Sequence, residues 1–88
     1  MNIEFTKHAL EEIQIRGIEL DIVEKIIRNP KQVLESEKNR KVYQDIIEFE
    51  NNKQYVVRII IDETKDINKV VTVYKSSKIK KYWREDES

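Results

Sequence analysis

The 88-residue sequence lacks cysteine and contains only one histidine, His8, one glycine and one proline. Without cysteine the chain can form neither a disulfide framework nor a thiolate metal site. A single histidine excludes the histidine pair of a zinc site, and no glycine-rich phosphate loop or paired acidic motif for two metals is present. We therefore expect any hydrolysis by this chain to need no metal ion and no other cofactor.

Long apolar segments are missing as well. No run approaches the length of about 18 residues that a membrane-spanning helix needs. The opening residues 1–4 lack the basic and apolar parts of a secretory signal. We expect a cytoplasmic protein that does not enter a membrane, and the length indicates that residues 1–88 form a single domain.

The charges cancel overall but are unevenly distributed. The chain has 17 Lys and Arg against 17 Asp and Glu. Residues 1–37 hold five cations and eight anions, a net charge of −3, whereas residues 75–84 hold five cations and no anion. Tyr82 and Trp83 lie within that basic segment. Cations interleaved with aromatic side chains can hold a phosphate backbone and stack bases, but a solvated, lysine-rich tail is an equally valid interpretation.

The first third of the chain has the period of two short helices. Thr6 can cap a helix over residues 7–16 whose buried stripe would be Ala9, Leu10 and Ile13, and Gly17 suits the left-handed position that ends it. A second helix is expected from about residue 19 until Pro30, because proline disfavours helical backbone in the residue before it.

From residue 31 onward the apolar residues alternate at period two. This pattern predicts strands over residues 31–35, 42–49, 54–62 and 69–75, followed by a helical turn over residues 78–84. The expected architecture is α+β: two N-terminal helices packed on a four-stranded antiparallel sheet, with a short C-terminal helical turn.

Few side chains can carry chemistry. Histidine is the side-chain type suited to proton transfer near neutral pH, and His8 has Glu12 and then Arg16 at i,i+4 spacing. Glu12 could orient the imidazole and Arg16 could hold a phosphate, although a surface ladder of ion pairs explains the spacing too. Arg58 interrupts an apolar strand, so it lies either on a solvent-exposed face or in a polar cleft.

The last predicted strand and the segment after it add polar candidates. Thr72 and Tyr74 should share one face with Val70, and the tyrosine could contact phosphate or a base or simply cover the sheet. Ser77 and Lys78 follow directly at the start of the predicted helical turn, where hydroxyl and backbone donors suit an anion.

Taken together, these residues resemble a small bacterial family known as domain-of-unknown-function family 4258. The resemblance covers residues 3–84 and rests on an ordered set of short motifs: Phe5-Thr6-Lys7-His8-Ala9, Arg16-Gly17-Ile18, Val23, Asn29-Pro30, Arg58, Val71-Thr72-Val73-Tyr74, Ser77-Lys78-Ile79 and Lys81-Tyr82-Trp83. Members of the family resemble RelE-type toxin ribonucleases in fold, which implies a RelE-toxin-like architecture for this chain.

That resemblance implies a toxin-like, metal-independent endoribonuclease that cleaves RNA through the ribose 2′-hydroxyl and is paired with an antitoxin protein. The implied catalytic residues are His8, Arg16, Arg58 and Tyr74, and the implied RNA-binding residues are Thr72, Ser77, Lys78, Lys81 and Tyr82. The alternative is a non-catalytic module of the same fold that binds protein or RNA, which the balanced net charge favours.

Overall fold

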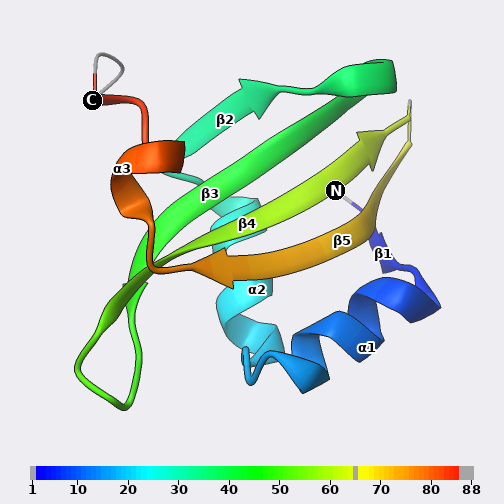
Figure 1. Cartoon of the computed structure of the whole chain (residues 1–88). Helices are drawn as coiled ribbons and strands as arrows, with labels where there is room; N and C mark the ends of the chain where they lie inside the picture. The colour runs from blue at the N-terminus through cyan, green and yellow to red at the C-terminus, as the bar shows by residue number, and fades with distance from the viewer. Residues whose placement is uncertain (1, 65, 86–88) are drawn as a thin grey trace.

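The computed structural model describes residues 2–64 and 66–85, which form a five-stranded sheet with helices on both of its faces (Figure 1). The order of the strands is β1-β5-β4-β3-β2. The helices are α1 (Lys7–Ile15), α2 (Leu20–Arg28) and α3 (Ile79–Tyr82), with a 3-10 turn η1 (Glu37–Asn39). The strands are β1 (Asn2–Phe5), β2 (Gln32–Glu35), β3 (Arg40–Glu48), β4 (Gln54–Glu63) and β5 (Ile67–Ser76).

The predicted four-stranded antiparallel sheet, and with it the RelE-toxin-like architecture, is wrong. The structure is α+β with a mixed sheet of five strands, because β1 precedes the two helices and pairs in parallel with β5 over Ile67–Val70. The other neighbouring strands pair antiparallel. Asn2–Phe5 alternates polar and apolar residues, but the segment is short and its partner strand lies more than 60 positions away. Such a short alternation directly before a helix cap is a weak signal, and β1 is missing from the predicted sheet.

Helices α1 and α2 cover one face of the sheet and enclose the core. The core joins apolar side chains of both helices to those of three strands, namely Ala9, Ile13, Ile18, Val23, Ile26, Ile27, Tyr43, Val57, Ile59, Ile61, Val70 and Val73. Leu10, which we expected in the buried stripe, is 46% exposed. Only Ala9 and Ile13 of the predicted stripe face the sheet closely enough to be buried. No helix within residues 2–64 and 66–85 is long and apolar enough to cross a membrane.

Both predicted ends of α1 are confirmed. The Thr6 hydroxyl accepts a hydrogen bond from the backbone N–H of Ala9 at 3.0 Å, which satisfies one of the unpaired donors at the helix start. Gly17 has a φ of +64° and its N–H donates to the carbonyl of Gln14. A side chain at that φ would be strained, so glycine allows the chain to turn directly from α1 into α2.

An irregularity in β5 decides which side chains face away from the helices. Ile60 pairs with Thr72 whereas Ile61 pairs with Val70, so Val71 is an extra residue in the ladder. Neighbouring residues of β4 point to opposite faces, which places Val70 in the core and Thr72 on the other face. The prediction that Val70 shares the face of Thr72 is therefore wrong, because a bulge reverses the alternation at this point.

A polar contact at one end of the sheet should make stability depend on pH. The Tyr43 hydroxyl donates to Glu63 Oε2 at 2.5 Å, and Lys41 Nζ lies 3.2 Å from Glu63 Oε1. The hydrogen bond from Tyr43, followed by the attraction of Lys41, lowers the pKa of Glu63 below its ordinary value of 4.5, against an opposing effect of burial. Burial, then the hydrogen bond and charge of Glu63, raises the pKa of Tyr43 from 10.0 to about 12.

We expect the stability of the Tyr43→Phe variant to depend less on pH than that of the wild type at both ends of the pH range. A depressed carboxyl pKa stabilises the fold above the unfolded value, so the wild type should weaken as pH falls below about 4.5. A raised phenol pKa stabilises the fold below the unfolded value, a contribution lost between pH 10.0 and about 12. Urea denaturation across pH should show shallower slopes in both windows for the variant, which should also be about 1–2 kcal/mol less stable at pH 7. Parallel curves for the two proteins would contradict this account.

Candidate phosphate site on the open sheet face

The face of the sheet opposite α1 and α2 carries Arg58 at its centre. Arg58 of β4 pairs with Gln44 of β3 on one side and with Tyr74 of β5 on the other, so the three side chains share one face. Arg58 Nη1 donates to the Tyr74 hydroxyl at 2.9 Å, and the guanidinium carbon lies 4.3 Å from the ring centroid of Tyr82 in α3. Tyr74 and Tyr82 meet edge to face with their centroids 6.2 Å apart.

Arg58 is half-buried and has no carboxylate partner among residues 2–64 and 66–85. The ion pairs of the described residues are His8–Glu12, Arg16–Glu12 and Lys41–Glu63, and none includes Arg58. Its Nε is buried without a hydrogen-bond acceptor. Withdrawing a cation from water is costly when nothing compensates its charge, and aromatic rings offset only part of that cost. The arrangement is therefore suited to an external anion that approaches Arg58 from the open face.

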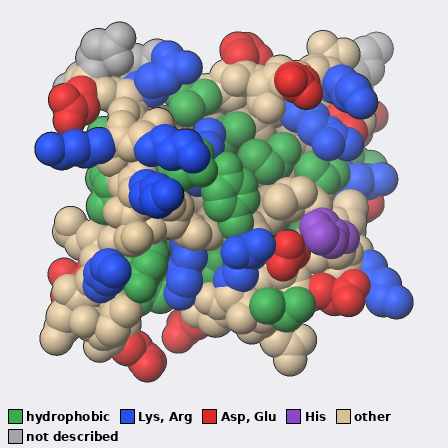
Figure 2. Space-filling model, in the orientation of Figure 1, with side chains coloured by type: hydrophobic (Ala, Val, Ile, Leu, Met, Phe, Trp, Pro, Cys, Tyr) green, Lys and Arg blue, Asp and Glu red, His purple; other side chains and the backbone are tan. Residues whose placement is uncertain are grey.

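The basic C-terminal segment is docked on this face through α3. Tyr82 is half-buried against Arg58, while Lys81 is exposed with its Nζ 5.2 Å from the Tyr82 ring. Ser77 and Lys78 are exposed at the start of α3, where the Lys78 N–H donates to Ser76 Oγ at 3.1 Å. Figure 2 shows Lys and Arg side chains grouped where α3 crosses the sheet, beside its apolar centre. The segment is thus held in place with its cations directed to solvent.

Lys75 does not belong with these cations. It pairs with Val57, which lies in the core, so its side chain is on the face opposite Tyr74. There Lys75 Nζ lies 4.0 Å from the ring centroid of Phe49 and 4.9 Å from that of Tyr55. Of the five cations in residues 75–84, this one lies over the aromatic rings of the β3–β4 hairpin instead.

Sequence reasoning missed two glutamines beneath α3. Gln44 is fully buried and Gln32 is 5% exposed, and their side chains are bonded to each other and to the backbone around α3. Gln44 interrupts the period-two pattern of Val42 and Ile46, which is the signal that could have revealed it, whereas Gln32 begins its strand and gives no such signal. A glutamine in a strand is usually read as a surface residue, because its burial depends on a distant segment that supplies hydrogen-bond partners.

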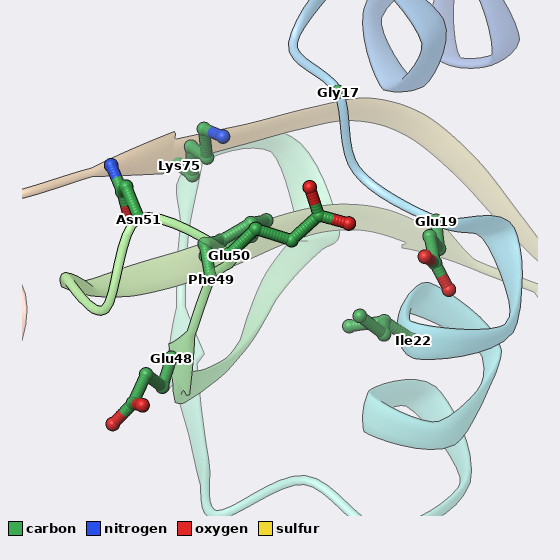
Figure 3. Close-up of a pocket in the computed structure, with 8 residues that line it drawn as sticks. All are labelled: Gly17, Glu19, Ile22, Glu48, Phe49, Glu50, Asn51 and Lys75. Carbon is green, nitrogen blue, oxygen red and sulfur yellow. The ribbon is translucent and has the colours of Figure 1, made fainter.

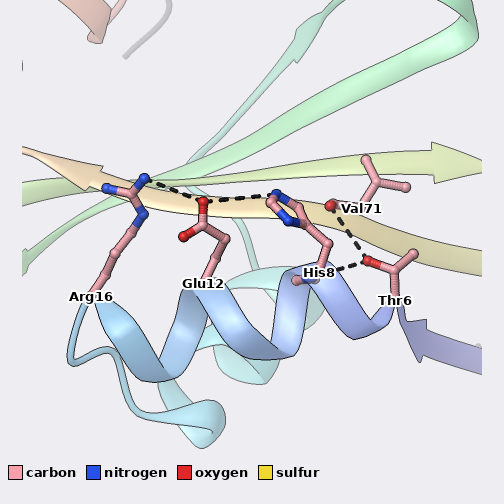
Figure 4. A network of polar contacts seen from close by, with 6 residues as sticks. Thr6, His8, Glu12, Arg16 and Val71 are labelled. Atoms are coloured by element: carbon pink, nitrogen blue, oxygen red, sulfur yellow. Dashed lines mark hydrogen bonds and ion pairs between the residues drawn. The ribbon is translucent and has the colours of Figure 1, made fainter.

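His8, Glu12 and Arg16 form a second polar group along α1. Glu12 Oε1 lies 3.7 Å from His8 Nε2 and accepts a hydrogen bond from Arg16 Nη2 at 3.4 Å. Figure 4 shows the three side chains in a row, extending from α1 toward β5. The His8 side chain is 65% exposed, whereas that of Glu12 is 19% exposed. The predicted ladder of charges is therefore present, with an accessible imidazole at its end.

Thr6 ties this ladder to β5. The Thr6 hydroxyl donates to the Val71 carbonyl at 3.5 Å, and the Thr6 N–H donates to the Val70 carbonyl at 3.0 Å (Figure 4). These two bonds fix the start of α1 against β5, one residue before Thr72. The one histidine is visible from the open side in Figure 2. No hydrogen bond or ion pair links the ladder to Arg58 in the part of the chain that the structure describes.

A cavity of about 410 Å³ lies on the other side of the molecule, between the start of α2 and the β3–β4 hairpin. In Figure 3 the Glu50 side chain extends across it from the hairpin toward Gly17 and Glu19. Its lining residues are Gly17, Glu19, Ile22, Glu48, Phe49, Glu50, Asn51 and Lys75. The three carboxylates make it unsuitable for a phosphate, and none of the predicted site residues lines it.

Comparison with known proteins gives one match. A family model described as Domain of unknown function (DUF4258) matches residues 5–75, which is most of the chain. No curated protein and no solved structure matches it. The matched region includes the ladder on α1 as well as Arg58, Thr72 and Tyr74, and it ends before α3 begins.

Proposed function

Since the chain belongs to the family described as Domain of unknown function (DUF4258), whose description assigns no activity, we propose from the site itself that it is a metal-independent endoribonuclease. The observation that carries the proposal is Arg58: a half-buried guanidinium with no carboxylate partner in the described part of the chain, hydrogen-bonded to Tyr74 and lying over the Tyr82 ring. This combination suits a phosphodiester flanked by bases, because phosphate takes the in-plane donors of arginine and aromatic rings stack bases. A cytoplasmic location accompanies the proposal, because RNA is the substrate.

The proposed reaction is transfer of the phosphodiester to the neighbouring ribose hydroxyl. The 2′-oxygen attacks phosphorus, the bond from phosphorus to the 5′-oxygen breaks, and the products are a 2′,3′-cyclic phosphate and a free 5′-hydroxyl. His8 takes the proton of the 2′-hydroxyl and returns one to the leaving 5′-oxygen, while Glu12 orients the imidazole. Arg16 and Arg58 stabilise the negative charge that develops on the phosphorane oxygens.

The remaining site residues hold the rest of the RNA in this proposal. The exposed cations Lys78 and Lys81 contact flanking phosphates, and Ser77 adds a hydroxyl donor beside them. Tyr74 and Tyr82 stack bases, and Thr72 lies two positions before Tyr74 on the same face of β5. We also propose that the ribonuclease acts as a toxin, which would need a neutralising antitoxin, namely a protein that covers the same basic face.

One feature favours the alternative of a non-catalytic RNA- or protein-binding module. No hydrogen bond or ion pair joins the ladder on α1 to the Arg58 group within the described residues, so acid–base chemistry depends on the substrate bridging the two. The salt dependence of binding would distinguish an RNA ligand from a protein partner of such a module. RNA affinity should fall steeply as salt rises, because counterions are released, whereas a protein partner held by apolar contacts should be much less sensitive.

Replacing His8 tests the proposed chemistry. We expect His8→Ala to slow cleavage of RNA in the presence of EDTA by about 100-fold or more, the usual contribution of a general acid–base group. RNA affinity should change little, because the imidazole is not needed to hold phosphate. The measurement is cleavage of a labelled RNA under single-turnover conditions, with binding followed in parallel.

Lys7→Ala is the matched control, because Lys7 is an exposed residue of the same helical turn. It should cleave at the wild-type rate. If the wild type binds RNA without cleaving it, the binding module is the correct function. If His8→Ala cleaves as fast as Lys7→Ala, the assignment of His8 is wrong.

A further inference from the structure

Gln44 and Gln32 lie on the same face of the sheet as Arg58, in an apolar part that the segment containing α3 covers. Their apolar neighbours Leu34 of β2, Val42 of β3 and Val56 of β4 are at most 8% exposed. A buried amide in such surroundings is costly unless hydrogen bonds compensate it, so its position needs a physical reason.

The bonds of the two amides all lead toward the chain around α3. Gln44 Nε2 donates to the Tyr82 carbonyl at 3.0 Å and to Gln32 Oε1 at 2.7 Å. Gln32 binds both backbone groups of Arg84, which follows α3. Its Nε2 donates to the Arg84 carbonyl at 2.5 Å, and its Oε1 accepts from the Arg84 N–H at 3.1 Å. Two side chains of the sheet thereby fix the backbone at Tyr82 and Arg84.

Fixing the backbone at Tyr82 sets how Arg58 is presented. The Tyr82 ring lies 4.3 Å from the guanidinium carbon and covers a face of that group, which leaves the in-plane donors available. Of those donors, Nη1 is bonded to Tyr74, while Nε is buried. The nitrogen left for an oxyanion is Nη2. Stacking on Tyr82 therefore does not compete with phosphate but orients the plane in which phosphate would bind.

We propose that Gln44 is a positioning residue of the phosphate site, acting through Tyr82 to orient the Arg58 guanidinium toward its ligand. The inference deepens the proposed function and rests on it for the identity of the ligand, an RNA phosphate. Its geometric part concerns only this chain: the bond from Gln44 to the Tyr82 carbonyl keeps the ring stacked on Arg58.

The test is Gln44→Met, which keeps the length of the side chain but removes both donors. Gln44 Oε1 is buried without a donor, so methionine also removes an uncompensated acceptor and the variant should stay folded. Two signals test the proposal: the side-chain N–H resonance of Arg58, which a stacked ring shifts, and the affinity for a short single-stranded RNA. Fluorescence of Trp83, the only tryptophan, reports whether the segment stays docked.

We expect the Arg58 resonance of Gln44→Met to move toward that of an unstacked arginine and RNA affinity to fall by about 2- to 10-fold, the size of one lost hydrogen bond. Tyr82→Ala leaves the glutamines intact but removes the ring, and it should reproduce both changes. Val73→Ala, a core variant on the opposite face, is the control for a general loss of stability and should leave the Arg58 resonance in place.

The experiment distinguishes failure of the positioning role of Gln44 from failure of the proposed function. An unshifted Arg58 resonance in Gln44→Met or Tyr82→Ala would overturn the positioning role, and so would RNA affinity that stays unchanged or rises while the resonance moves. If the wild type binds no RNA, the ribonuclease and RNA-binding proposals fail, and Gln44 is then not a positioning residue of an RNA site even if the resonance moves.

Discussion

Arg58→Ala is expected to have the largest effect of any single substitution on the proposed activity. Cleavage should fall by about 100- to 1,000-fold, the range seen when a donor that stabilises transition-state charge is removed. RNA affinity should also fall, because the variant loses a phosphate contact and leaves Tyr74 and Tyr82 without the cation that joins them. Arg58→Lys should recover only part of either loss, since an ammonium lacks the planar fork that binds phosphate and stacks on a ring.

Arg28→Ala is the matched control for this experiment. It removes the same charge from an exposed position at the end of α2. Salt titrations should show a slope reduced by about one ion for Arg58→Ala, as expected for one lost phosphate contact. Arg28→Ala should keep the wild-type slope and cleavage rate. Equal behaviour of the two variants would mean that Arg58 contributes only to net charge, and the site would have to be sought elsewhere.

Ile59→Ala should cause the largest loss of stability. Ile59 has no exposed surface and lies in the middle of β4, between β3 and β5 and beneath the two N-terminal helices. Truncating such a residue removes apolar contacts and leaves a cavity, at a cost of about 2–5 kcal/mol. Domains of this size have a total stability of about 5–15 kcal/mol. The variant should therefore melt at least about 10 °C below the wild type.

Thermal denaturation followed by circular dichroism is the appropriate measurement. Val33→Ala provides the comparison, because Val33 is an apolar residue of β2 that is 43% exposed. Its loss should be within about 1 kcal/mol. A similar shift for both variants would show that the enclosed layer between the helices and the sheet does not dominate stability.

The elements that depend on neighbouring residues were predictable, and those that depend on distant ones were not. The Thr6 cap and the turn at Gly17 follow from local backbone chemistry, and strands β2 to β5 follow from alternation. In contrast, β1 exists only because β5 offers a free edge to it. The extra residue Val71 reverses the alternation within β5, and no residue in that apolar run marks where a bulge will form.

The candidate site shows the same division. Arg58 and Tyr74 could be singled out because a charge or a hydroxyl stands out in an apolar strand. The position of Tyr82 over Arg58 could not be foreseen. The two residues are 24 positions apart, and two glutamines of other strands hold the backbone that brings them together. The role of Lys75 was also hidden, because counting charges along a segment does not show which face of a strand each one occupies.

The parallel pairing of β1 with β5 has a consequence for synthesis of the chain. A ribosome releases the N-terminal strand first, but that strand has no partner until Ile67–Val70 have emerged. The backbone groups of Asn2–Phe5 therefore remain unpaired until β5 has been synthesised. The imidazole of α1 and the guanidinium of β4 come into their final relation only after that pairing forms. The proposed site is thus assembled late, after β5 has left the ribosome, and a nascent chain that ends before Ile67 should lack it.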